Sequence, residues 1–135
     1  MSNADSLFLG LQHIGLPTAD LEKTIAFYER FGFHVDWSHD SGPNDKVAFL
    51  RCESCVIETY LTEHPALANG AVDHIAIDVS DIQKAYTHAL SLGYEALEQK
   101  ITFLPFFEHG VKYFTILGVN NEKIEFNQKL NSNNQ

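Results

Sequence analysis

Two histidines and two glutamates occupy matching positions in two similar halves of this sequence. His13 opens the stretch HIGLPTADL, and His74 opens HIAIDVSDI 61 positions later (74 − 13 = 61). Glu58 and Glu125 lie in the last β-prone stretch of their own halves, CVIETYL and KIEFNQ. Imidazole and carboxylate groups together suit zinc, nickel, cobalt, manganese or ferrous iron. The repeated set therefore predicts a site for one divalent metal ion, with two positions of an octahedral ion left open for substrate or water.

The alternation of side chains along a strand indicates which way these four residues face. In HIAIDV the two isoleucines and the valine form one face, which puts His74 on the opposite face. By the same parity, His13, Glu58 and Glu125 lie opposite the apolar residues next to them. A single His or Glu on a strand is more often solvated or hydrogen-bonded than a ligand, so the metal prediction depends on the duplication.

The pattern of the first half predicts one strand, one helix and three more strands. Residues 7–17 are apolar and β-prone, and the helical stretch after them ends at Gly32. Turn-forming residues separate three further predicted strands, at 33–39, 46–52 and 55–61.

The second half repeats this order. A predicted strand at 71–79 precedes a helix whose apolar residues follow the i, i+3, i+4, i+7, i+8 rule. The later strands are predicted at 94–100, 111–119 and 122–128. Between the first two of these lies 101–110, ITFLPFFEHG, an aromatic connection that we expect to fold over the site.

These patterns predict an α+β fold made of tandem βαβββ modules. The first module spans 7–62 and the second 71–128, and together they form one domain. The linker is 63–70, and we expect flexible termini at 1–6 and 129–135.

Composition excludes several classes of partner. Nine basic and eighteen acidic residues give a formal net charge of −9, the wrong sign for nucleic acid or an anionic membrane surface. No apolar run approaches the ~20 residues of a membrane span, and we expect a cytoplasmic protein with a small-molecule substrate. Cys52 and Cys55 form a lone C-x-x-C without a second pair of ligands, which favours a reduced hairpin over a structural zinc site.

The sequence resembles the vicinal oxygen chelate superfamily, the glyoxalase/bleomycin-resistance/dioxygenase group, from about residue 9 to about residue 128. The resemblance lies in the paired modules, the two His-containing openings quoted above, and the closing NEKIEFNQ. It implies that the modules form a cupped, barrel-like mixed sheet with the helices outside. The concave faces of the two open, cupped sheets would enclose a metal ion that binds two oxygens of the substrate. It also implies that the modules pair within one chain or exchange between two, and we expect a homodimer.

Within that superfamily, the ligand order His, Glu, His, Glu is similar to that of glyoxalase I, the lactoylglutathione lyase. Pro17 and Thr62 stand where that enzyme would have an arginine and an asparagine for glutathione, which argues against glutathione as the substrate. The implied activity is that of a divalent-metal-dependent lyase or isomerase, in which a proton moves through a metal-bound enediolate of a small α-hydroxycarbonyl or thiol adduct. We expect Glu125 to be the base, and the duplication makes Glu58 the alternative.

Six residues are predicted to contact the substrate: Phe49, Arg51, Tyr60, Phe107, His109 and Tyr113. Arg51 shares a predicted strand face with Phe49, where it could bind a carboxylate or form a surface ion pair. Three other functions stay open. They are a metal-free drug-binding protein of the bleomycin-resistance type, a ring-cleaving dioxygenase and a thiol transferase.

Overall fold

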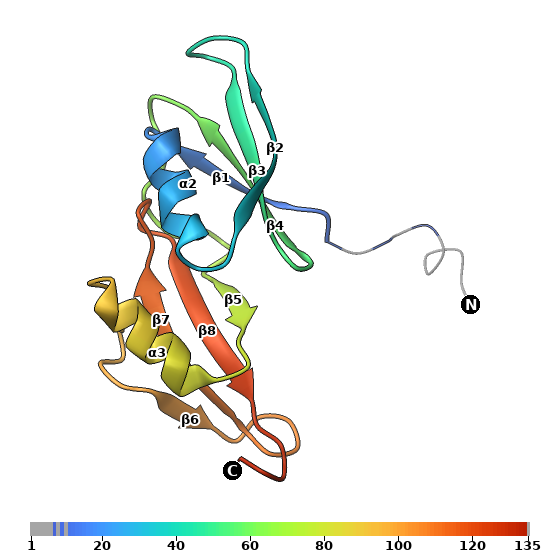
Figure 1. Cartoon of the computed structure of the whole chain (residues 1–135), viewed down its shortest axis with the longest axis vertical. Helices are drawn as coiled ribbons and strands as arrows, with labels where there is room; N and C mark the ends of the chain where they lie inside the picture. The colour runs from blue at the N-terminus through green and yellow to red at the C-terminus, as the bar shows by residue number, and fades with distance from the viewer. Residues whose placement is uncertain (1–6, 8, 10, 135) are drawn as a thin grey trace. The chain divides into compact units, whose positions relative to one another are not determined.

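The chain folds into two compact units, each built from a four-stranded sheet with a helix on one face (Figure 1). The computed structural model describes residues 7, 9 and 11–134. Unit 1 is Met1–Ala66 and unit 2 is Leu67–Gln135, so the division falls within the segment 63–70. Among the described residues, no helix is long and apolar enough to cross a membrane.

The sheet of unit 1 has the strand order β1-β4-β3-β2. Only β1 and β4 pair in parallel, and the other neighbours are antiparallel. The elements, in chain order, are β1 (Ile14–Thr18), α2 (Leu21–Glu29), β2 (His34–Asp40), β3 (Lys46–Cys52) and β4 (Cys55–Leu61).

Unit 2 repeats this topology with the order β5-β8-β7-β6, in which β5 and β8 are the parallel pair. Its elements are β5 (Ile75–Asp78), α3 (Ile82–Ser91), β6 (Thr102–Leu104), β7 (Val111–Leu117) and β8 (Lys123–Lys129). The predicted α+β fold of two βαβββ modules with mixed four-stranded sheets is confirmed.

Both helices begin at an aspartate. The Asp20 carboxylate accepts the backbone N–H of Lys23 at 3.0 Å, and Asp81 accepts that of Lys84 at 3.1 Å. These bonds satisfy amides that have no partner within the helix. The two caps therefore start both helices at matching positions of the repeat, shortly after β1 and β5.

Each helix covers one face of its own sheet with large apolar side chains. In unit 1, Tyr28 of α2 is 1% exposed, and its ring meets those of Phe27 and Phe33 at 4.9 Å and 5.2 Å between centroids. In unit 2, the Phe114 ring lies 5.1 Å from both Tyr86 and Phe126, measured between ring centroids. The opposite face of each sheet is thereby left for other side chains.

The predicted strand at 94–100 is wrong. Gln99 has a left-handed backbone (φ 62°), and its backbone N–H donates a hydrogen bond to the Ala96 carbonyl. These residues therefore form a turn and not an extended strand. The edge strand is instead β6, inside the predicted connection 101–110. The predicted strand 7–17 shortens to β1, although residues 8 and 10 lie outside the described part of the chain.

Candidate metal and substrate site

In unit 1, His13 and Glu58 face each other across the parallel pair β1 and β4. His13 directly precedes β1, and Gly15, two residues after His13, is in register with Glu58. The His13 Nε2 lies 3.8 Å from Glu58 Oε1. Phe49 of β3 is directly opposite Glu58, so it projects from the same face of the sheet.

Unit 2 reproduces this geometry. His74 directly precedes β5, Ala76 is in register with Glu125, and the His74 Nε2 lies 3.5 Å from Glu125 Oε1. The helix-facing neighbour Ile124 is 1% exposed, which leaves Glu125 on the open face. In each unit, the predicted His and the predicted Glu therefore lie next to each other on the open face of the sheet.

The residue before each histidine orients its ring. His13 Nδ1 lies 2.9 Å from Gln12 Oε1, and His74 Nδ1 lies 3.0 Å from Asp73 Oδ2. An oxygen beside Nδ1 accepts a hydrogen bond in the tautomer that carries the proton at Nδ1, and this tautomer leaves the Nε2 lone pair available to a metal ion. Hydrogen bonds from His74 and Lys123 also lower the pKa of Asp73, which keeps that partner a carboxylate.

Both pairs fit a divalent metal ion in their donor atoms and spacing. Two ligand atoms at about 2.1 Å from one ion are about 3.0 to 3.4 Å apart in octahedral or tetrahedral geometry. The observed separations of 3.8 Å and 3.5 Å need only a small shift to reach these values. Within the described residues, no three His, Cys, Asp or Glu side chains gather in one group, and each unit by itself supplies two donors.

The two glutamates differ in their second carboxylate oxygen. Asn127 donates its side-chain amide to Glu125 Oε2 at 2.8 Å. In unit 1 the matching position is Tyr60, and the Glu58 carboxylate lies beside His13. The Glu125 side chain is 17% exposed and that of Glu58 is 30% exposed. Asn127 lies two residues after Glu125 in β8, so strand alternation is the signal that places it on the face of Glu125.

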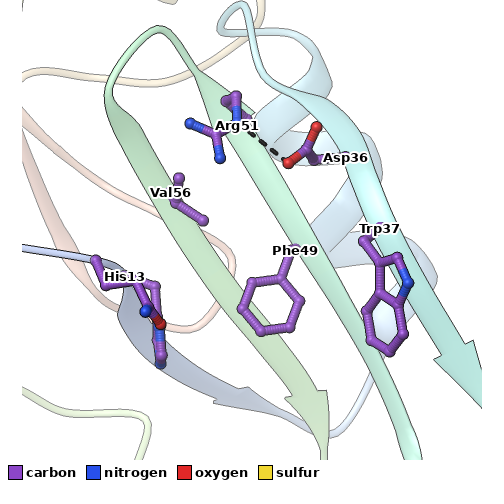
Figure 2. A pocket seen from close by; sticks show the side chains of 7 residues that line it. His13, Asp36, Trp37, Phe49, Arg51 and Val56 are labelled. Carbon is purple, nitrogen blue, oxygen red and sulfur yellow. Dashed lines mark hydrogen bonds and ion pairs between the residues drawn. The ribbon is translucent and has the colours of Figure 1, made fainter.

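A cavity of about 410 Å³ lies beside His13 on the open face of unit 1. Figure 2 shows Phe49 and Arg51 projecting from this face of β3, with Trp37 on one side and His13 on the other. The His13 and Phe49 rings meet edge to face at 5.6 Å, and Trp37 lies 6.0 Å from Phe49, between centroids. The Arg51 Nε donates to Asp36 Oδ2 at 3.1 Å.

A β-bulge brings Trp37 into this cavity. The register of β2 against β3 shifts by one residue, so Val35 pairs with Leu50 and Trp37 pairs with Phe49. Simple alternation would have put Trp37 on the face of Val35, toward the helix. The extra residue is Asp36, which is how Trp37 and Asp36 both come to line the cavity.

Comparisons with known proteins agree with this architecture. The model of the Glyoxalase/Bleomycin resistance protein/Dioxygenase superfamily matches residues 10–101. The chain belongs to this superfamily. It is 34% identical over 128 residues to the uncharacterized protein YwbC of Bacillus subtilis (strain 168), a match that covers 88% of this chain and 97% of the relative.

Two solved structures of this superfamily share the fold. The glyoxalase family protein from Enterococcus faecalis superimposes with a TM-score of 0.71 at 20% identity, covering 89% of this chain and 98% of that one. A glyoxalase family protein from Bacillus cereus superimposes with the same TM-score of 0.71 at 17% identity, covering 96% and 100%.

The other substrate residues predicted for this superfamily member lie in several places. Tyr60 and Glu58 line a second hollow of about 360 Å³ in unit 1. Tyr113 is directly opposite Asn127, on the open face of unit 2. Phe107 and His109 lie in the connection between β6 and β7.

That connection contacts the C-terminal end of β8. Phe107 is 71% exposed, and the Lys129 Nζ lies 4.4 Å from the centre of its ring. His109 is half-buried, and its Nε2 lies 3.6 Å from Glu108. Whether the connection closes over a substrate therefore stays a prediction.

Proposed function

We propose that this superfamily member is a divalent-metal-dependent, glyoxalase-like lyase or isomerase that moves a proton between adjacent carbons of a small α-hydroxycarbonyl or thiol adduct. The observation that carries the proposal is the repeated His–Glu pair. In both units, an acceptor at Nδ1 leaves the histidine Nε2 directed at a carboxylate. A protein that only sequesters a ligand does not need two such pairs.

His13, Glu58, His74 and Glu125 would together hold one ion of zinc, nickel, cobalt, manganese or iron. When bound, the ion would polarise the substrate oxygens and offset the negative charge that develops as a proton leaves carbon. The Nδ1 partners Gln12 and Asp73 would keep the imidazole rings oriented for binding.

A glutamate side chain performs the proton transfer in this proposal. Its carboxylate takes the proton from the hydroxyl-bearing carbon next to the carbonyl and returns it to the former carbonyl carbon. The hydroxyl proton passes to the former carbonyl oxygen, so the atoms balance and no oxidant or reductant is consumed. The base must be free to move toward the substrate, and the contacts of Glu125 and Glu58 differ in this respect. Asn127 restrains Glu125, whereas Glu58 is more exposed, which favours Glu58 as the base and Glu125 as the fixed ligand.

Elemental analysis of metal content tests the proposal. We expect one ion per set of two His and two Glu after loading with zinc, nickel, cobalt or manganese, and loss of that ion in His13→Ala and His74→Ala. His64→Ala is the matched control, because His64 is 93% exposed and its nearby carboxylate is Glu63. Absence of bound metal under every loading condition would remove the enzyme proposal.

Turnover is then tested on the loaded protein with methylglyoxal thiol adducts and other α-hydroxycarbonyls. The expected homodimer is tested by sedimentation of the same sample, with and without metal.

A second candidate function is that of a metal-free binding protein of the bleomycin-resistance type, which the exposed Trp37 beside Phe49 favours. Tight binding of an aromatic compound to protein that takes up no metal would support that function instead.

A further inference from the structure

We propose that the cavity beside His13 binds a planar aromatic carboxylate, with the ring against Phe49 and Trp37 and the carboxylate on Arg51. This inference rests on the proposed function only for the position of the reacting atoms. What it adds is the chemical class of the substrate. The cavity, the two aromatic rings and the arginine all belong to unit 1 (Figure 2).

The aromatic part of the cavity is formed before any ligand binds. Trp37 is 56% exposed, which leaves a large apolar ring uncovered in the chain by itself. Its indole lies parallel to the His39 ring, with 6.0 Å between centroids and 4° between planes. Phe49 meets it at 64°. Two rings set at an angle favour a flat, apolar group that stacks on one and meets the edge of the other.

Arg51 is held in place while part of its guanidinium stays available. The Nε donates to Asp36, and Nη1 donates to the Glu53 carbonyl at 3.3 Å. These bonds use two of the five N–H donors and fix the plane of the group. The remaining donors can bind the two oxygens of a carboxylate, which a lysine cannot match in geometry. The Arg51 side chain is 42% exposed, so these donors are accessible.

The register sets the distance between the two ends of the ligand. Phe49 is directly opposite Glu58, and Arg51 is two residues further along β3. Two residues of a strand span about 6.7 Å, so a carboxylate on Arg51 would be about that far from the level of the His13–Glu58 pair. One aromatic ring bridges a gap of this size. A volume of about 410 Å³ also falls within the range usual for small-molecule sites.

The only tryptophan of the sequence is Trp37, so fluorescence excited at wavelengths that tyrosine does not absorb reports on this cavity. The experiment titrates metal-free protein with 4-methylbenzoate, its neutral amide 4-methylbenzamide, and the non-planar cyclohexanecarboxylate. We expect a saturable fluorescence change with 4-methylbenzoate and affinities at least about tenfold lower for the other two. Equal affinity for benzoate and benzamide, or no saturation up to the solubility limit, would overturn the proposal.

Variants of the arginine separate its role from overall charge. Arg51→Gln should weaken 4-methylbenzoate binding by about tenfold or more, and Arg51→Lys should lie between the two. Lys23→Gln removes the same charge from an exposed position on α2 and should bind as the unchanged protein does. If Arg51→Gln does not fold, the benzoate and benzamide comparison still decides. Because binding is measured without metal, its failure would leave the proton-transfer proposal standing, and failure of metal binding would leave this one.

Discussion

The Asn127 side chain donates a hydrogen bond of 2.8 Å to Glu125 Oε2, on the side of the carboxylate away from its contact with His74. The bond holds one carboxylate oxygen and leaves the other 3.5 Å from the histidine Nε2. The His13–Glu58 pair of unit 1 has Tyr60 at the matching position. The two halves therefore repeat their ligands but differ in the residue that orients one of them.

We expect Asn127→Leu to weaken metal binding by about 10- to 100-fold, because the substitution removes the amide that orients Glu125. Titration with cobalt, followed by its visible absorption, measures the affinity. Tyr60→Phe is the matched variant in unit 1 and should leave the affinity unchanged. Equal weakening in both variants would show that the Asn127 bond has no special part in holding the ligand.

The two glutamates should respond differently to the loss of a carboxylate. Glu58→Gln should keep most of the bound metal while turnover falls by about 10²- to 10⁴-fold, the usual loss when a general base is removed. Glu125→Gln should lose metal as well as turnover. Metal content and rate are measured on the same samples. Full activity in Glu58→Gln would instead return the role of base to Glu125.

The N-cap aspartates should contribute measurably to stability. Asp81→Ala removes the acceptor of the Lys84 amide and should lower the free energy of unfolding by about 1 kcal/mol. Asp81→Asn keeps an acceptor oxygen at the same position and should lose much less. Urea unfolding followed by circular dichroism measures both. Identical losses in the two variants would assign the effect to charge rather than to the cap.

Two phenylalanines of unit 2 should differ strongly in their effect on stability. Phe114 is 1% exposed and packs between Tyr86 and Phe126, so Phe114→Ala should cost about 3–5 kcal/mol. Phe107 is 71% exposed, and Phe107→Ala should cost less than about 1 kcal/mol. Thermal unfolding compares them. A loss of stability in Phe107→Ala as large as in Phe114→Ala would mean that the Phe107 side chain is buried in solution.

Cys55 should react slowly with alkylating reagents at pH 8. Burial, together with the neighbouring Cys52, raises the pKa of Cys55 above its ordinary value of 9.0, and only the thiolate is nucleophilic. The rate should rise about tenfold per pH unit up to that pKa. The raised pKa means that folding favours the neutral Cys55 thiol, which contributes to the free energy of unfolding. This contribution is fully present below the pKa of Cys55 in the unfolded protein and is lost as the pH rises through its pKa in the folded protein.

Peptide mass spectrometry after iodoacetamide treatment measures this rate. Protein unfolded in urea is the control, and its Cys55 should react faster at pH 8 because the burial is removed. The same rate in folded and unfolded protein would contradict the raised pKa.

Local sequence patterns were sufficient for the order of elements, and strand alternation predicted the open face for each of the two His and two Glu residues. Apolar periodicity, the glycines that end the helices and strand alternation are properties of neighbouring residues, so they can be seen without knowledge of the fold. His13 and Glu58 illustrate this: each needed only the apolar residue beside it to be placed on the open face. The edge strand was harder, because edge strands are short and pair on one side only. The left-handed backbone at Gln99 interrupts the predicted strand 94–100, and the edge strand is β6 instead.

The amino-acid sequence by itself determined two βαβββ modules and the residues that each presents opposite its helix, because side-chain periodicity and duplication are written in neighbouring positions. Only the tertiary structure decided which side chains share the cavity. The bulge at Asp36 turns Trp37 toward Phe49, and the pairing of β3 with β4 puts Arg51 two residues from the level of Glu58. Register between strands depends on hydrogen bonds between distant parts of the chain, and a shift of one residue reverses the face of every side chain after it.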